Sequence, residues 1–357
     1  MLNSLLKDIK VIDLSGVLAG PSVAMFLAEL GAHVIKIENP NTQGDITRQW
    51  KNPKENPKEN LSAYYLSVNA FKEVRYLNLL KKSDLENLYE LVKSADILIT
   101  NFKYKDDVKL AVHYDLIKSI NPTIIYVAIS GFGKNNPRVA FDLILQAETG
   151  FMHLNREEQN LPNKIPVALI DVLCAHQIKE GILLALYKKL KVGSGAYVHC
   201  SLYDAAVVSL VNQGANYSVS SYNPPPLGSK HPNIAPYGEI FKTKDNQLIT
   251  FAIGSDIQFK KLCEVINLHG LNNDTRFISN QNRVINRGVL YDILQKNIEQ
   301  INCSYLYDIC IQNNIPVGLI KDIEQVMNNL ETQKLIKPFT VDNKTYNILT
   351  SIAFEIL

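Results

Sequence analysis

The stretch KVIDLSGVLAGPSVAMFLAELGAHVIKIE, residues 10–38, decides the fold class. KVIDL and HVIKIE are short apolar runs typical of buried strands, and the turn SGVLAGPS separates the first of them from VAMFLAELG. VAMFLAELG is apolar at helical spacing and ends on Gly31, a residue that commonly terminates helices. A strand, a helix and a second strand in this order predict a βαβ unit with parallel strands and a right-handed crossover.

The same alternation of strand and helix patterns continues along the chain. The pattern predicts helices near 84–93 and 114–120, strands at 95–100 and 123–130, a long helix at 171–191, and then a short strand and a helix through 205–212. Strands that are apolar on both faces belong in a sheet that helices cover on both sides. The fold class is therefore predicted to be α/β, with a Rossmann-like large domain built on a parallel sheet.

A change in composition marks the expected domain boundary. Residues 218–235 are rich in Ser, Asn and Pro, including three consecutive prolines, which is typical of an interdomain crossing. YGEIFKTKDNQLITFAIG beyond it predicts a hairpin that turns at Asp245-Asn246, followed by a helix at 256–266. We expect a large α/β domain at 1–217, a smaller α+β domain at 225–325, and a C-terminal segment at 326–357 that returns to the large domain.

One surface loop is predicted from a local repeat. The polar segment KNPKENPKEN, residues 51–60, contains NPKEN twice in succession. Such a composition indicates an exposed loop.

Composition excludes several classes of function. The net charge is +2, only 20% of the residues are charged, and dense Lys/Arg interleaved with aromatics is absent, so nucleic acid is not an expected partner. No apolar run approaches the ~18 residues that span a bilayer, and no cationic leader precedes the first strand, so we expect no membrane association and a cytoplasmic location. The five cysteines and seven histidines are scattered without ligand spacing, which predicts neither a disulfide framework nor a metal site.

A single acidic residue interrupts the apolar stretch PVALIDVLCAHQIKEGILLAL, residues 166–186. Asp171 stands there between a strand-like run and the long helix. Asp is favoured just before a helix, where it accepts hydrogen bonds from unpaired backbone N–H groups, so a helix cap is one interpretation. A carboxylate kept ionised at a helix start is also a nucleophile or base, which is the other. The local pattern leaves both open.

Two residues near Asp171 also carry reactive side chains, Cys174 and His176. Cys174 lies three residues beyond and can share its helix face, so it is either a thiol nucleophile with an acidic neighbour or a small buried apolar residue. His176 projects about 140° away from Asp171 on a helix and cannot easily serve the same ligand.

The glycine loops do not carry a nucleotide fingerprint. GVLAGP, residues 16–21, follows the first strand, but its GxxxG spacing differs from GxGxxG, which argues against specific NAD binding. A glycine loop between a strand and a helix can still receive a phosphate or an extended ligand on its backbone N–H groups. SGFGK (130–134) and GSG (193–195) are interpreted as tight turns.

Four segments in order resemble the class III CoA-transferases, a family that includes formyl-CoA:oxalate and succinyl-CoA:dicarboxylate transferases and acyl-CoA racemases. The resemblance covers about residues 8–330. The segments are VIDLSGVLAGPSVAMFLAELGAHVIKIENP with the following GD and Arg48, SADILITNF, INPTIIYVAISGFG running into FDLILQAETGFM, and LGSKHPNIAPYGEIFKTKDNQLITFAIGSDIQFKKLC. The resemblance implies a homodimer whose two chains pass through one another as interlocked rings.

The resemblance also implies a reaction and its nucleophile. CoA would move from an acyl-CoA donor to a free carboxylic acid, with coenzyme A bound as part of the substrate and no metal. Asp171 would attack the donor thioester to give a mixed anhydride, and the CoA thiolate would attack back to give an aspartyl-CoA thioester. Water must be kept away from these intermediates.

Seven positions are implied as CoA contacts. They are Leu18, Ala19, Lys72, Asn101, Phe102, Lys109 and Gly131. From the residues alone, Asn101 is a turn residue and Phe102 a core aromatic, so the resemblance alone favours a binding role for these two.

The chain departs from the family pattern at several positions. Glu73 replaces an arginine, Asn39 stands where a phosphate-binding arginine is common, and the loop after the long helix reads VGSGA. Lys72, Arg75 and Lys109 would have to compensate, or affinity for CoA would be low. An α-methylacyl-CoA racemase needs a histidine where Phe141 stands, so racemisation is one alternative function, and non-catalytic CoA binding is the other.

Overall fold

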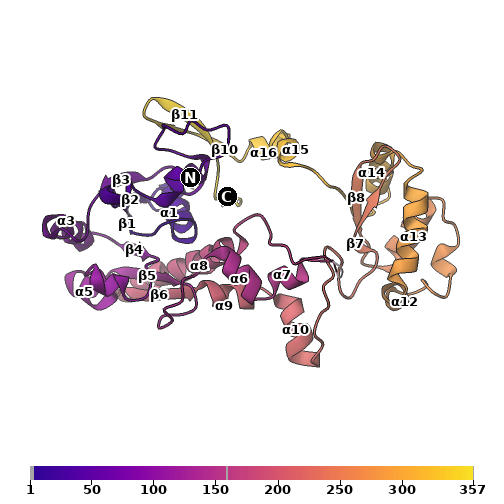
Figure 1. Ribbon diagram of the computed structural model, residues 1–357, viewed down its shortest axis with the longest axis horizontal. Helices are drawn as coiled ribbons and strands as arrows, with labels where there is room; N and C mark the ends of the chain where they lie inside the picture. The colour runs from indigo at the N-terminus through magenta and orange to yellow at the C-terminus, as the bar shows by residue number, and fades with distance from the viewer. Residues whose placement is uncertain (1–3, 158–159, 357) are drawn as a thin grey trace. The chain divides into compact units, whose positions relative to one another are not determined.

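A computed structural model describes residues 4–157 and 160–356 (Figure 1). The chain forms two compact units. Unit 1 comprises Met1–Gly150, Lys164–Ala215 and Leu330–Leu357, and unit 2 comprises Phe151–Asn163 and Asn216–Asn329.

Unit 1 is built on a six-stranded sheet in the order β3-β2-β1-β4-β5-β6, with every neighbouring pair parallel. The strands are β1 (Lys10–Asp13), β2 (His33–Glu38), β3 (Glu73–Tyr76), β4 (Ile97–Thr100), β5 (Ile125–Ser130) and β6 (Ala196–Ser201). This order is that of the doubly wound nucleotide-binding folds, in which the strand order reverses beside β1. The predicted α/β class and the predicted parallel βαβ unit are confirmed, since Val11 lies opposite Val34 in β2 and Ile97 in β4.

Helices cover both faces of this sheet. On one face, Leu88 and Val92 of α3 and Ile117 of α5 are fully buried in a cluster with Ile12 and Leu98. Because side chains alternate along a strand, the neighbouring residues point to the other face, which α1 and α8 cover. The helices of unit 1 are α1 (Ala19–Glu29), α2 (Ala63–Asn69), α3 (Lys82–Lys93), α4 (Asp106–Lys109), α5 (Tyr114–Ile120), α6 (Asp142–Glu148), α8 (Leu169–Val192), α9 (Leu202–Val208) and α16 (Leu330–Gln333).

One predicted helix is interrupted. The pattern through 205–212 predicted a continuous helix, but α9 ends at Val208 and α10 (Val211–Ser220) begins three residues later. Val211 has a φ of 46°, a left-handed conformation that does not continue a right-handed helix. The predicted exposed loop at 51–60 is confirmed, because those residues form turns without a helix or strand.

The C-terminal residues form a hairpin that the sequence did not indicate. The strands β10 (Ile336–Val341) and β11 (Lys344–Leu349) pair antiparallel, and Ile348 packs with Met25 of α1 and Leu66 of α2. The buried carboxylate of Glu29 in α1 accepts hydrogen bonds from Thr350 and Ser351 just beyond. The C-terminal hairpin, in yellow, thus packs against the N-terminal part of the chain (Figure 1).

Unit 2 is a small α+β unit around an antiparallel sheet in the order β7-β8-β9. Phe241, Phe251 and Phe259 are buried at its centre. The predicted hairpin is confirmed, because β7 and β8 pair around a turn in which Asn246 has a φ of 62°. Its elements are α7 (Phe151–Leu154), β7 (Tyr237–Lys242), β8 (Leu248–Ala252), α11 (Asp256–Val265), α12 (Asn280–Ile285), α13 (Arg287–Ile298), α14 (Cys303–Gln312), β9 (Val317–Leu319) and α15 (Ile323–Met327).

In the part of the chain that the structure describes, no helix combines the length and the apolar character that crossing a bilayer requires.

Candidate active site

A cavity of about 330 Å³ opens in unit 1 where the carboxyl ends of β1, β4, β5 and β6 meet. In doubly wound sheets, ligands bind at this edge because the loops after the strands converge there. The loop Gly16–Ala19 follows β1, Asn101 and Phe102 follow β4, Gly131 follows β5, and Asp171 enters from the first turn of α8. The family resemblance implied eight site residues, which are Asp171 and the seven CoA contacts. Six of these eight therefore line one cavity.

Asp171 is not the cap of its helix. The N-cap residue of α8 is Ala168, and Asp171 lies in the first helical turn. Asp142, the first residue of α6, takes the capping role instead, because its carboxylate accepts a hydrogen bond of 2.7 Å from the backbone N–H of Ile170. The cap interpretation of Asp171 is thus wrong, and its carboxylate remains available to the cavity.

A second residue of α6 fixes the chain that leads into α8. The side-chain oxygen of Gln146 accepts a hydrogen bond of 2.8 Å from the N–H of Ile165, and its amide nitrogen donates to Asp142 at 2.6 Å. Gln146 is fully buried, so these contacts are protected from water. Together Asp142 and Gln146 set the position from which Asp171 enters the cavity.

The carboxyl group of Asp171 has an unusual affinity for protons. Burial, and secondly the negative charge of Asp142, raise its pKa from 3.8 to about 7. A carboxylate that is poorly solvated when ionised loses little hydration on attacking an electrophile. Asp171 thus has the character expected of a nucleophile rather than of a structural surface acid.

The loop after β1 is held in a strained conformation. Val17 has a φ of 71°, which a β-branched residue rarely adopts. Asn101 makes two hydrogen bonds with Gly16, the residue before Val17. Its side-chain oxygen accepts from the N–H of Gly16 at 2.9 Å, and its side-chain amide donates to the Gly16 carbonyl at 2.7 Å. Asp45 accepts from the N–H of Val17 at 3.2 Å. Contacts on both residues therefore preform the loop that lines the cavity.

Lys72 supports this loop from behind and does not line the cavity. Its ammonium group is fully buried and donates to Asp13 at 2.9 Å, to the carbonyl of Pro21 at 2.8 Å and to Asn69 at 2.9 Å. Burial lowers the pKa of Lys72 to about 8, although Asp13 opposes that effect. Its three donors are already used within the protein.

Lys36 extends the same buried network. It donates to the carbonyl of Ser15 at 2.9 Å and lies 3.2 Å from Asp45. Two buried lysines and two buried aspartates thus surround the base of the Gly16–Ala19 loop.

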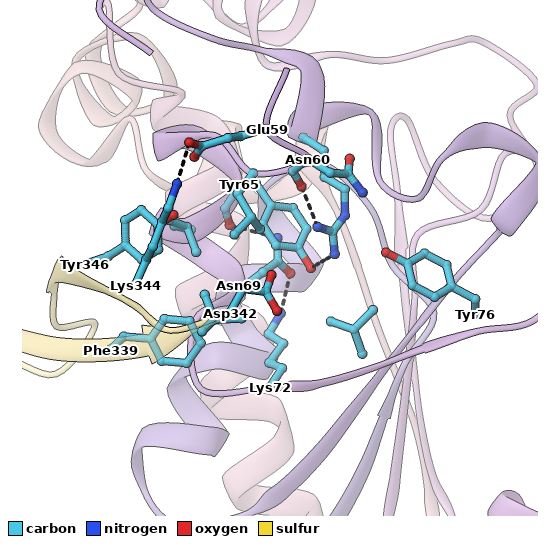
Figure 2. Close-up of a pocket in the computed structure, with 15 residues that line it drawn as sticks. Glu59, Asn60, Tyr65, Asn69, Lys72, Tyr76, Phe339, Asp342, Lys344 and Tyr346 are labelled. Carbon is cyan, nitrogen blue, oxygen red and sulfur yellow. Dashed lines mark hydrogen bonds and ion pairs between the residues drawn. The ribbon is translucent and has the colours of Figure 1, made fainter. Parts of the chain in front are cut away.

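A second cavity, of about 390 Å³, lies beside this network (Figure 2). Figure 2 shows Lys72 bonded to Asn69 on one side, and Lys344 of the C-terminal hairpin paired with Glu59 on the other. Arg48 also lines it, but its guanidinium is buried against Glu38 at 2.7 Å and stacks on Tyr65. These cations are occupied by partners within the chain, and Asp171 does not line this cavity.

Three further residues that the resemblance implied as CoA contacts, Phe102, Gly131 and Lys109, differ in their position relative to the cavity. Phe102 lines the Asp171 cavity and also packs against the core beneath it, and its binding role stays a prediction. A Cβ on Gly131 would lie 2.2 Å from the Cβ of Ala140, so glycine lets the following loop fold back over the cavity. Lys109, the last residue of α4, is exposed and does not line the cavity.

Several lining residues were missed from the sequence. Ser130 and His199, 69 positions apart, form a hydrogen bond of 3.0 Å, and burial followed by Lys134 lowers the pKa of His199. Tyr197 stacks on Tyr126 across the pair of strands. Only the register of β5 on β6 brings these residues together, and no local motif encodes that register.

The alternatives around Asp171 are resolved by burial. Cys174 is fully buried and is absent from the cavity wall. Its hydrogen bond with Cys200, and then burial, raise its pKa, which makes it an unreactive thiol. His176 is exposed and lies outside the cavity, whereas Phe141 lines it. All five cysteines are free.

Metal ligands are not clustered in the described residues. Across residues 4–157 and 160–356, no group of three or more His, Cys, Asp or Glu side chains could hold a metal ion.

Unit 1 thus combines a doubly wound α/β fold with a proton-binding carboxyl group in the cavity at its switch point. The model of CoA-transferase family III matches residues 6–353, so the chain belongs to that family. Its members act on CoA thioesters.

Known proteins are similar over nearly the whole chain. The chain is 35% identical to a succinate–glutarate CoA-transferase of Agrobacterium fabrum over 334 residues, which is 92% of this chain and 83% of that protein. It is 32% identical to an acetyl-CoA:oxalate CoA-transferase of Acetobacter aceti, covering 90% and 82%. The crystal structure of a CAIB/BAIF family protein from Brucella suis matches with a TM-score of 0.85 and 32% identity, covering 98% of this chain and 92% of that one.

Proposed function

We propose that the protein moves CoA from an acyl-CoA donor to a free dicarboxylic acid, with Asp171 as the covalent nucleophile. The observation that carries this proposal is the partly buried carboxyl group of Asp171, with a pKa raised to about 7, on the wall of the cavity at the switch point. A nucleophile of this kind needs no base, because at neutral pH about half of it is already ionised.

The reaction proceeds through two covalent forms of Asp171. The carboxylate attacks the thioester carbon, the C–S bond breaks, and an aspartyl-acyl anhydride and the CoA thiolate result. The thiolate then attacks the aspartyl carbonyl, which releases the donor acid as a carboxylate and leaves an aspartyl-CoA thioester. The acceptor carboxylate attacks that thioester, and the same two steps run in reverse. No proton is consumed, and the thioester energy is conserved as long as water is excluded.

Dicarboxylic acids are the proposed acid substrates. The similar proteins are named for succinate, glutarate, oxalate and mesaconate, each of which carries two carboxyl groups. Identities of 30–35% support this class without selecting one of its members.

The proposed assembly is an interlocked homodimer, and the proposed compartment is the cytoplasm. The exposed apolar residues on α8 and α10, such as Leu184, Leu190 and Val219, support association with a second copy. Five free cysteines are compatible with a reducing compartment.

Trapping the covalent intermediate tests the proposal. The protein is incubated with a panel of acyl-CoA donors, quenched with hydroxylamine and digested, and peptides are examined for an aspartyl hydroxamate. We expect the adduct at Asp171 with at least one dicarboxylic acyl-CoA. Asp107→Asn, which changes another carboxylate of the same cavity, is the matched control and retains the adduct. No adduct at Asp171 with any donor would overturn covalent transfer.

A further inference from the structure

The cations that the resemblance assigned to the phosphates of CoA are either paired within the protein or absent from the wall of the Asp171 cavity. Lys72 is fully buried and makes three hydrogen bonds within the protein. Arg75 lies 2.6 Å from the carboxylate of Glu73, and Lys109 stands outside the cavity wall. CoA carries several phosphate charges, which other cations must meet.

The wall of the Asp171 cavity supplies such cations. Its basic side chains are Lys103, Lys105, Lys134 and Arg138, and its acidic side chains are Asp107 and Asp171. Arg138 is paired with Glu148. The three lysines are exposed and form no salt bridge with a carboxylate in the part of the chain that the structure describes. They are therefore available to an anionic ligand.

The side chain of Lys134 has a defined position in the cavity wall. Its ammonium lies 4.3 Å from the centre of the Tyr197 ring, which restricts a long side chain by cation–π contact. The imidazole of His199 stacks on the same Tyr197. Beside it, Ser130 bonds to His199 and accepts from the N–H of Gly133 at 3.2 Å. An ammonium, a hydroxyl and an imidazole thus surround one point of the cavity.

We propose that Lys103, Lys105 and Lys134 hold the phosphate groups of CoA in this chain, in place of Lys72, Arg75 and Lys109. The inference rests on the proposed function, because it takes CoA as the ligand. It identifies the residues that offset the missing family arginines at Asn39 and Glu73.

The electrostatics favour a phosphate over the second carboxylate of the acid substrate. Burial and Asp142 raise the pKa of Asp171, whereas Lys134 contributes to the lowered pKa of His199. The positive charge of Lys134 therefore acts on His199. A short dicarboxylic acid places its second carboxylate close to the reacting one, but the phosphates lie at the far end of the pantetheine arm.

Binding measurements test this assignment without turnover. Affinities for CoA and 3′-dephospho-CoA are measured by calorimetry at low and high salt for Lys103→Gln, Lys105→Gln, Lys134→Gln and Lys134→Arg. Each Gln variant is expected to weaken CoA binding by about three- to tenfold at low salt and less at high salt. Lys134→Arg retains affinity. Lys109→Gln tests the competing assignment, and Lys82→Gln, 92% exposed in its side chain, is the matched control. Both keep the affinity of the unmodified protein.

A second readout follows His199 directly. In NMR titrations of the histidines, assigned with His199→Gln, the pKa of His199 rises when CoA binds, because a phosphate favours the imidazolium. An unchanged pKa would remove Lys134 from the phosphate site.

Other outcomes would overturn the assignment as a whole. One is that CoA affinity is unchanged in Lys103→Gln, Lys105→Gln and Lys134→Gln. Another is that Lys109→Gln loses as much CoA affinity as these three variants do. A third is a raised KM for dicarboxylic acids with CoA affinity unchanged, which would place the acid substrate at these lysines.

The proposed function and the proposed phosphate site can be contradicted independently of each other. CoA binding that depends on the lysines without an adduct at Asp171 contradicts only covalent transfer, and an adduct with lysine-independent binding contradicts only the phosphate site.

Discussion

Asp142, which is buried, and Asp171, which is partly buried, are carboxyl groups on neighbouring helices, and their partners separate their roles. Asp142 accepts hydrogen bonds from the N–H of Ile170 and from the side-chain amide of Gln146. The pKa of Asp171 is raised by burial and by the charge of Asp142. One carboxylate therefore positions the helix and repels charge, and the other is left reactive.

The rate of CoA transfer should fall as the pH drops below about 7, because protonated Asp171 cannot attack a thioester. In Asp142→Asn the loss of the neighbouring negative charge lowers the pKa of Asp171, so the acidic limb of kcat/KM moves to lower pH. Burial is the larger cause of the raised pKa, so the limb does not reach 3.8. The pH profiles of both proteins check this, and an acidic limb that stays in place would show that Asp142 does not act on the nucleophile.

Replacing Asp171 by Asn should stabilise the protein at pH 8. The pKa of Asp171 is higher in the folded protein than in the unfolded chain, so the folded state binds more protons between pH 3.8 and about 7 and loses stability as the pH rises through that window. Above it, the buried charge costs up to roughly 4 kcal/mol, which Asn removes. Urea unfolding at pH 8 and pH 4 measures the difference, which should nearly disappear at pH 4. A destabilised variant at pH 8 would contradict the raised pKa.

At the scale of elements, the strand–helix alternation was predictable because it is encoded by local apolar spacing, as in residues 10–38. Asp171 was predictable because an acid in an apolar run is locally conspicuous. The roles of Lys72 and Asp142 were not, because their partners Asp13 and Ile170 lie 59 and 28 positions away. The sequence could not show that Lys72 is buried beneath the loop rather than facing the ligand. The domain boundaries remain a prediction, and the assignment of 151–157 and 160–163 to unit 2 was not foreseen.

The loop between β1 and α1 should depend on Lys72 as a positioning residue. Lys72→Met leaves the carboxylate of Asp13 buried with only part of its partners, which should cost about 3–5 kcal/mol of the free energy of unfolding. Lys82→Met, in an exposed i,i+4 pair with Glu86, should cost less than about 0.5 kcal/mol. Urea unfolding compares the two variants. CoA binding should weaken in Lys72→Met, and Lys72→Arg should not restore it, because a guanidinium does not fit the three partners of an ammonium. Equal stability of the two Met variants would contradict the positioning role.

At the scale of the whole molecule, α8 is apolar beyond what one chain can bury. Ile178 and Ile182 are fully buried on one side, yet Leu184 is 70% and Leu190 86% exposed on the other. Several large apolar side chains left exposed on one helix are typical of an interface. The exposed side therefore supports the proposed homodimer.

Charge on this face should disrupt association. Leu184→Glu places a carboxylate in the proposed interface, where its desolvation is costly. Light scattering should give twice the 40.1 kDa of one chain for the unmodified protein, and monomer or aggregate for the variant. Leu80→Glu, at a residue 68% exposed elsewhere in unit 1, is the control that remains dimeric. A dimer in both variants would place the interface elsewhere.

The proposed interlocked arrangement makes a separate kinetic prediction. Two chains that merely touch exchange partners by dissociation, at a rate set by the strength of the interface. Two linked rings cannot separate until at least one of them opens, so exchange requires unfolding of part of the chain. When differently tagged dimers are mixed under native conditions, mixed dimers should not form over hours, as native mass spectrometry can follow. After joint unfolding in denaturant and refolding, about half of the dimers should be mixed, as random pairing of two equal pools requires. Rapid exchange without denaturant, in a protein that light scattering shows to be dimeric, would mean that the chains associate side by side.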